Sequence, residues 1–122
     1  MFREMYLAAA LQKVYEHDAS ACRAEDVLKM ACVGGARAMG LPDCDDIAPG
    51  KRADLVVINL RRPNMQPLNN IAANIVYAGS KENVRLTMVN GRILYENGEF
   101  FIGEKPEYIY TAANAFMEAI RK

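Results

Sequence analysis

Hydrophobic positions recur three and four residues apart at the start of the chain, which predicts a helix over residues 2–17. They fall on two stripes, one at Leu7, Leu11 and Val14 and a roughly opposite one at Phe2, Met5, Tyr6 and Ala9. A surface helix of a small domain normally buries one apolar face. A helix with two apolar sides needs packing partners on both sides. We do not expect so short a chain to provide both partners.

Residues 24–33 predict a second helix, because Val27, Leu28, Ala31 and Cys32 form an apolar side. Cys32 is accordingly expected to be buried and inert. The glycine pair at 34–35 is expected to interrupt this helix, and Gly40 to end the short piece that follows.

A loop rich in turn residues then leads into "PGKRADLVVINL", residues 49–60. Residues 53–60 predict a strand, and the consecutive aliphatics Leu55 to Ile58 favour burial on both faces. Lys51, Arg52 and Asp54 are interpreted as shaping the start of this strand, with Gly50 providing the turn.

Residues 69–77 predict a short helix with an asparagine cap, and Ile71, Ile75 and Val76 are expected to point inward. Two Asn-Gly pairs, at 90–91 and 97–98, follow. Asn-Gly suits type I′ turns, which need positive φ at both central residues. Strands are therefore predicted over 84–89, 92–95 and 99–102 as an antiparallel meander.

Pro106 is expected to open a last helix, whose apolar side holds Tyr110, Ala113, Phe116 or Met117, and Ile120. The succession of helices, one strand, a helix, a meander and a helix gives an α+β class.

Composition narrows the functional classes. The 122 residues include 15 basic and 15 acidic side chains and no basic run, which argues against a nucleic-acid partner. No apolar run approaches the roughly 20 residues of a membrane helix, and the start lacks a signal-peptide pattern. Three widely spaced cysteines do not form a disulfide framework, and they favour the reducing cytoplasm.

The residues show no catalytic constellation. His17 is the single histidine, whereas a catalytic zinc site usually needs three protein ligands, and a solvated role at a helix end is the simpler interpretation. "DCDD" at 43–46 lacks the calcium-loop pattern and is interpreted as turn-forming acids. "GGARAMG" at 34–40 is not a dinucleotide-binding fingerprint. We therefore assign no catalytic, cofactor-binding or metal-binding residue to this chain.

Four blocks in order nevertheless resemble the C-terminal region of the amidohydrolase superfamily, in its cytosine-deaminase-like branch of chlorohydrolases and S-adenosylhomocysteine and methylthioadenosine deaminases. The blocks are "FREMYLAAALQKV", "AEDVLKMACVGGARAMGL", "PGKRADLVVINLRRPNMQPLNN" and "NIVYAGSKENVRLTMVNGRILYENGEF". The resemblance covers about residues 1–102. Cys32, Asp45 and Asn59 depart from the family pattern, all in scaffold segments.

The resemblance implies a metal-dependent (β/α)₈-barrel hydrolase with a composite β-sandwich. By this resemblance, the enzyme of which this chain would be a part uses one divalent metal, zinc or iron. The metal would generate a hydroxide that deaminates a purine-type or related heterocycle. None of the family's metal ligands matches a residue here, so no cofactor is expected in this chain.

We therefore expect a C-terminal fragment that is catalytically inert alone. Residues 1–48 would be terminal barrel helices, 49–105 the C-terminal strands of the composite sandwich, and 106–122 a final helix. Open surfaces, including the Phe2, Met5 and Tyr6 side and unpaired sheet edges, are expected to drive self-association, as a dimer. The alternative is a stand-alone, non-catalytic scaffold or interaction module derived from such an enzyme.

Overall fold

Helix α1, Phe2–Glu16, begins the chain in a computed structural model that describes residues 1–121. It ends at His17, whose φ of 53° places it in the left-handed region. Met5 and Ala9 are buried, because α2 and the segment of residues 74–78 pack on that side. Leu7, Leu11 and Val14 are 42%, 63% and 71% exposed. The expectation that the Phe2, Met5 and Tyr6 side would be open is therefore wrong for Phe2 and Met5, whereas Tyr6 is 48% exposed; the opposite stripe is the more open one.

The second helical run continues across the glycine pair. It consists of α2, Ala24–Lys29, a π-helical turn η1, Met30–Gly34, and α3, Gly35–Ala38. Both glycines have right-handed helical dihedrals, so the predicted interruption is wrong: a wide turn absorbs the irregularity without ending the helix. Gly40, at φ 71°, does end the run, as predicted.

Cys32 is exposed, which contradicts the prediction that it is buried. The buried positions of this helical run are Ala24, Val27 and Ala36, and Cys32 lies off that line. The apolar side predicted for this helix therefore wrongly included Cys32.

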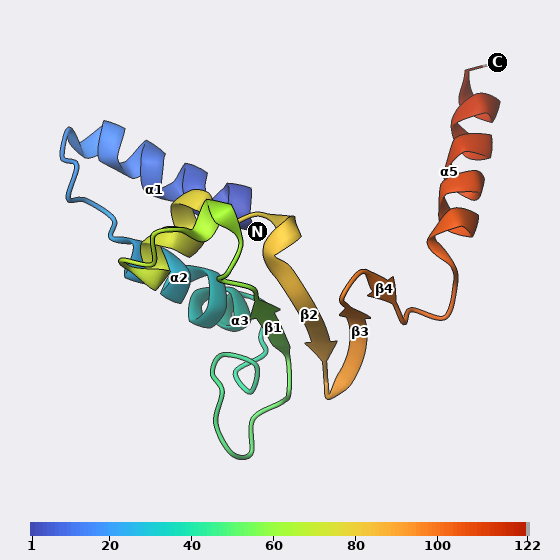
Figure 1. The fold of residues 1–122 in the computed structure, drawn as a ribbon, viewed down its shortest axis with the longest axis horizontal. Coiled ribbons are helices and arrows are strands. Elements are labelled where there is room, and N and C mark those ends of the chain that lie inside the picture. The colour runs from blue at the N-terminus through green and yellow to red at the C-terminus, as the bar shows by residue number, and fades with distance from the viewer. Residues whose placement is uncertain (122) are drawn as a thin grey trace.

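Four antiparallel strands form one sheet in the order β1-β2-β3-β4 (Figure 1). They are β1, Leu55–Ile58, β2, Val84–Val89, β3, Arg92–Glu96, and β4, Glu99–Phe100. Both Asn-Gly pairs have positive φ at each residue, which confirms the predicted turns.

Strand β1 lies at an edge of the sheet, and Val56 and Val57 are 56% and 44% exposed. Burial of its aliphatics on both faces is thus not found, because no layer of described residues covers them. The strand is also shorter than the predicted 53–60, and β4 ends two residues before the predicted 102.

Short helical elements connect β1 to β2. They are η2, Pro63–Met65, α4, Ile71–Ala73, η3, Asn74–Ala78, and η4, Lys81–Asn83. Asn70 caps α4 by accepting a hydrogen bond from the Ala73 N–H at 2.9 Å, as predicted. Val76 is buried, but Ile71 is 54% exposed, so its predicted inward position is wrong.

Helix α5, Pro106–Ile120, stands apart from the rest at the far end of the molecule from α1 (Figure 1). It begins at Pro106, as predicted, and none of its residues is buried. None of the described helices is both long enough and apolar enough to cross a membrane.

Candidate functional site

The side chains that could take part in catalysis or metal binding do not come together at one site. His17 is exposed and closes α1 by donating its backbone N–H to the Val14 carbonyl at 3.3 Å. Throughout residues 1–121, no group of three His, Cys, Asp or Glu side chains is placed to hold a metal ion. The described side chains therefore do not fit the catalytic divalent ion that the resemblance implies.

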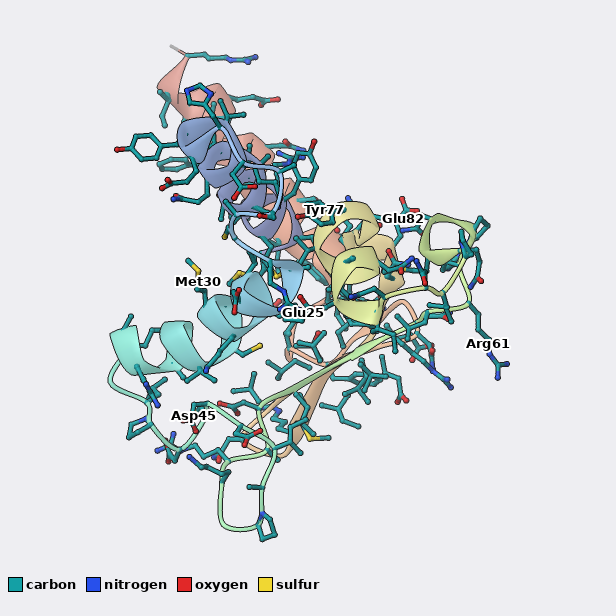
Figure 2. All side chains as sticks on the ribbon, turned by 90° about the vertical axis from the view of Figure 1, so that its left-hand side faces the viewer. Glu25, Met30, Asp45, Arg61, Tyr77 and Glu82 are labelled. Carbon is teal, nitrogen blue, oxygen red and sulfur yellow. The ribbon has the colours of Figure 1, made fainter. Side chains whose placement is uncertain are left out.

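Asp43 and Asp45 of the 43–46 segment are partners of the basic residues before β1. We call Asp43, Asp45, Lys51 and Arg52 the strand-start cluster. Arg52 Nε donates to Asp43 Oδ2 at 2.7 Å, and Lys51 Nζ donates to the Pro42 carbonyl at 2.8 Å and pairs with Asp45. Figure 2 shows Asp45 in the loop between α3 and β1. The cluster fixes the loop before β1, and the pairing of its acids with Lys51 and Arg52 was not foreseen in the sequence.

Electrostatics of this loop follow from the same pairs. The hydrogen bond from Arg52 lowers the pKa of Asp43, and the one from Lys51 lowers the pKa of Asp45. Asp54 Oδ1 accepts the backbone N–H of Asn90, which ties the start of β1 to the β2–β3 turn.

The Cys44 thiol donates to Asp43 Oδ1 at 3.7 Å, and the nearby Asp54 carboxylate, followed by burial, raises the pKa of Cys44 from 9.0 to about 11. The thiol therefore stays protonated at neutral pH. Because the thiolate is the reactive form of cysteine, Cys44 is unsuited to act as a nucleophile.

Sequence reasoning missed a pair of asparagines, the buried Asn83 and the exposed Asn64. Asn83 is fully buried, and its Oδ1 accepts from Asn64 Nδ2 at 2.8 Å while its Nδ2 donates to Asn64 Oδ1 at 3.1 Å. Ser80 donates its backbone N–H to Asn83 Oδ1 at 2.9 Å, and Asn59 donates its N–H to the Asn83 carbonyl at 2.7 Å. The Ser80–Asn83 spacing of a capping box is the signal that could have located it.

This network is structural. Within residues 1–121, every buried side-chain nitrogen and oxygen has a hydrogen-bond partner, so no unpaired buried group is aimed at a ligand. Its position links the end of β1 to the start of β2.

Two shallow hollows lie beside the sheet. The larger, about 510 Å³, is lined mainly by apolar side chains, with Val84, Leu94, Tyr95 and Phe100 among them. The second, about 380 Å³, is more polar and contains Arg62, Glu82, Arg85 and Asn97. Figure 2 shows the neighbouring Arg61 projecting away from the chain. Neither hollow contains a His or Cys side chain.

The arrangement is thus an α+β scaffold whose polar clusters are internally paired and whose apolar surface is partly uncovered. Comparison with known proteins identifies the scaffold: the amidohydrolase family model matches residues 1–94, and the chain belongs to this family. The resemblance seen in the sequence is confirmed.

Two curated relatives are deaminases. The chain is 42% identical over its whole length to a 5-methylthioadenosine/S-adenosylhomocysteine deaminase of Nitratidesulfovibrio vulgaris (strain Miyazaki F), of which it covers 27%. It is 44% identical, over 94% of its length, to a 5'-deoxyadenosine deaminase of Methanothermobacter thermautotrophicus, of which it covers 26%. The chain therefore spans about a quarter of the length of these relatives.

Solved structures agree with this fold. An adenosine deaminase from Xanthomonas campestris with bound zinc superposes with a TM-score of 0.94 at 33% identity, over 99% of this chain and 28% of that one. Atrazine chlorohydrolase from Arthrobacter aurescens, complexed with zinc, gives a TM-score of 0.84 at 24% identity, over 94% of this chain and 26% of that one. The second comparison supports the fold alone.

Proposed function

We propose that this chain is the C-terminal part of a metal-dependent amidohydrolase that deaminates an adenosine-type substrate. The supporting observation is its 42% identity, over the whole length, to a 5-methylthioadenosine/S-adenosylhomocysteine deaminase. The zinc in the solved Xanthomonas relative supports a divalent metal in the complete enzyme. The reaction would be hydrolytic, with water added at the amino-bearing carbon of the heterocycle and ammonia released.

The residues of this chain would contribute scaffold rather than chemistry. The strand-start cluster fixes the loop before β1, the Asn64–Asn83 pair joins residue 64 to the start of β2, and no described group fits a catalytic metal. The isolated chain is therefore expected to be inert.

A segment exchange tests the proposal. The 27% of the Nitratidesulfovibrio deaminase that this chain matches would be replaced by residues 1–122, and ammonia release from 5-methylthioadenosine would be measured with zinc present. We expect kcat/KM within about tenfold of the parent, because a scaffold exchange leaves transition-state contacts in place. A folded, zinc-loaded chimera without turnover would contradict the proposal.

The matched control is the 122-residue chain alone with zinc or iron. Turnover above that of buffer would contradict its inertness. A chain that is inert alone and also fails in the chimera would favour the alternative, a non-catalytic scaffold or interaction module.

We also propose that the isolated chain forms a dimer through its open apolar surfaces. The α1 stripe of Leu7, Leu11 and Val14 and the exposed face of edge strand β1 support this. Light scattering after gel filtration should give twice the chain mass at tens of micromolar, roughly the range of weak association. Leu11→Glu should restore the monomer, whereas Gln12→Glu beside it should not. A wild-type monomer would contradict the proposal.

A further inference from the structure

Helix α5 has no partner within this chain. All residues from Glu107 to Ile120 are exposed, and α5 makes no extensive contact with any other described helix or strand. Its large apolar side chains are among the most exposed in the molecule, with Phe116 and Tyr108 each at 67%. Figure 1 shows the helix clear of the sheet and of the other helices.

The sequence of α5 is that of a helix enclosed on most sides. Its polar residues within 107–120 all fall on one narrow stripe at spacings of four, three and four: Glu107, Thr111, Asn114 and Glu118. The remaining positions are alanine, aliphatic or aromatic, and Ile109, Phe116 and Ile120 lie opposite the stripe. Helices that are apolar around most of their circumference are normally buried.

A membrane surface does not suit this pattern. Helices that lie on membranes carry lysine and arginine on their polar face. The stripe of α5 is acidic, and α5 contains no Lys or Arg.

The position of α5 is nevertheless retained in a solved relative. A match that left out the 15 residues of α5 would cover at most 107 of the 122 residues, about 88% of the chain. The observed score is 0.94 over 99% of the chain. The matched helix of that protein therefore takes the same place relative to the sheet, although no other described helix or strand of this chain makes extensive contact with α5.

We propose that α5 docks in an apolar groove formed by the part of the amidohydrolase fold outside the matched segment, with its acidic stripe facing solvent. A second copy of α5 would cover only the narrow seam of a helix pair, whereas a groove built from several elements covers a helix that is apolar on three sides. This inference rests on the proposed function in one respect, that the chain is part of a longer amidohydrolase, and not on the proposed reaction.

Amide hydrogen exchange on two existing proteins tests the docking. In the 122-residue chain at about 1 µM, below the range of weak association, residues 106–120 should exchange close to the unprotected rate. The matched helix of the Nitratidesulfovibrio deaminase should exchange at least about 100-fold more slowly, at every dilution. Equal protection in the isolated monomer would overturn the proposal, because α5 would then need no partner. Protection in the deaminase that disappears on dilution to monomer would also overturn it, since a second copy would then be the partner.

Substitutions in the chimera described above locate the contact. Phe116→Glu should lower its Tm by at least about 3 °C without changing its mass in solution, while Glu118→Gln on the acidic stripe leaves Tm within about 1 °C. A Phe116→Glu chimera with unchanged Tm, or one whose mass is halved, would overturn the proposal. If the chimera does not fold, the exchange experiment decides alone.

Discussion

Buried hydrophobic side chains are unequally divided between the helical region (α1 to α3 with residues 63–78) and the sheet with α5. All seven lie in the former: Met5, Ala9, Ala24, Val27, Ala36, Met65 and Val76. The four strands and α5 contribute none, although both are rich in aliphatic and aromatic residues. The helical region thus has a core of its own, whereas the sheet and α5 have the composition of elements that are covered by something else.

The difference shows what each region depends on. Burial of apolar area is the main favourable term in folding, so the helical region should dominate the stability of the isolated chain. The sheet is held mainly by backbone hydrogen bonds and by the polar links at its two ends. The following predictions test this division, from the largest expected effect to the smallest.

Met65→Ala should have the largest effect. Met65 is fully buried, and truncating such a side chain costs about 2–5 kcal/mol of unfolding free energy. Val56→Ala in β1, where the side chain is 56% exposed, should change it by less than about 0.5 kcal/mol. Urea denaturation measures both. A loss of unfolding free energy at Val56 as large as that at Met65 would show that other residues bury the sheet face that is exposed in this structure.

Gly79→Ala should cost about 3 kcal/mol, at the upper end for overpacking. A Cβ there would lie 2.3 Å from the Ile75 carbonyl oxygen and 2.7 Å from the Phe2 ring, and the backbone atom cannot move aside cheaply. Gly79 therefore permits the contact of α1 with η3.

The matched control is Gly35→Ala. Its Cβ would meet nothing nearer than the Met30 carbonyl oxygen at 4.0 Å, within a helical turn. We expect a gain of about 0.5–1 kcal/mol from the lower entropy of the unfolded chain. A loss at Gly35 as large as that at Gly79 would contradict the close-packing explanation.

Asn83→Ala should cost about 2 kcal/mol, because it truncates a fully buried side chain and leaves the part-buried Ser80 N–H without its acceptor. Since this pair links the helical region to the sheet, hydrogen exchange should rise more in β1 and β2 than in α1. Asn114→Ala on the exposed stripe of α5 serves as the control and should be nearly neutral. An equal rise of hydrogen exchange in α1 and in the two strands would mean that the Asn64–Asn83 pair does not couple the helical region to the sheet.

Sequence reasoning succeeded where structure is set by local chemistry. The Asn-Gly turns, the Asn70 cap, the proline that opens α5 and the stop at Gly40 each depend on a few neighbouring residues. It failed where tertiary contacts decide. Which stripe of α1 is covered, how the helix passes through residues 34–35, and whether β1 is buried are all set by packing partners distant in sequence.

The polar clusters of the candidate site likewise divide into contacts that are local in sequence and contacts that folding creates. A role for Lys51 and Arg52 at the start of β1 was predicted, because their contacts are local; their partners, Asp45 and Asp43, lie within nine residues but were not named. The Asn64–Asn83 pair was not, since the Ser80–Asn83 capping-box spacing marks only Asn83, and folding brings Asn64 to it from 19 residues away.

The smallest effect concerns pH. Arg52 holds the pKa of Asp43 below its ordinary value of 3.8, so the folded state binds this proton less readily than the unfolded chain. The pair therefore adds stability above about pH 4, and this contribution disappears as pH falls through the lowered pKa. Arg52→Ala should lower Tm slightly at pH 7 and flatten the fall of Tm between about pH 5 and pH 2. Arg61→Ala, which removes a cation that projects away from the chain, should leave the pH profile unchanged. Parallel profiles for wild type and Arg52→Ala would show that the strand-start cluster fixes the loop by geometry alone, without a net contribution from its charges.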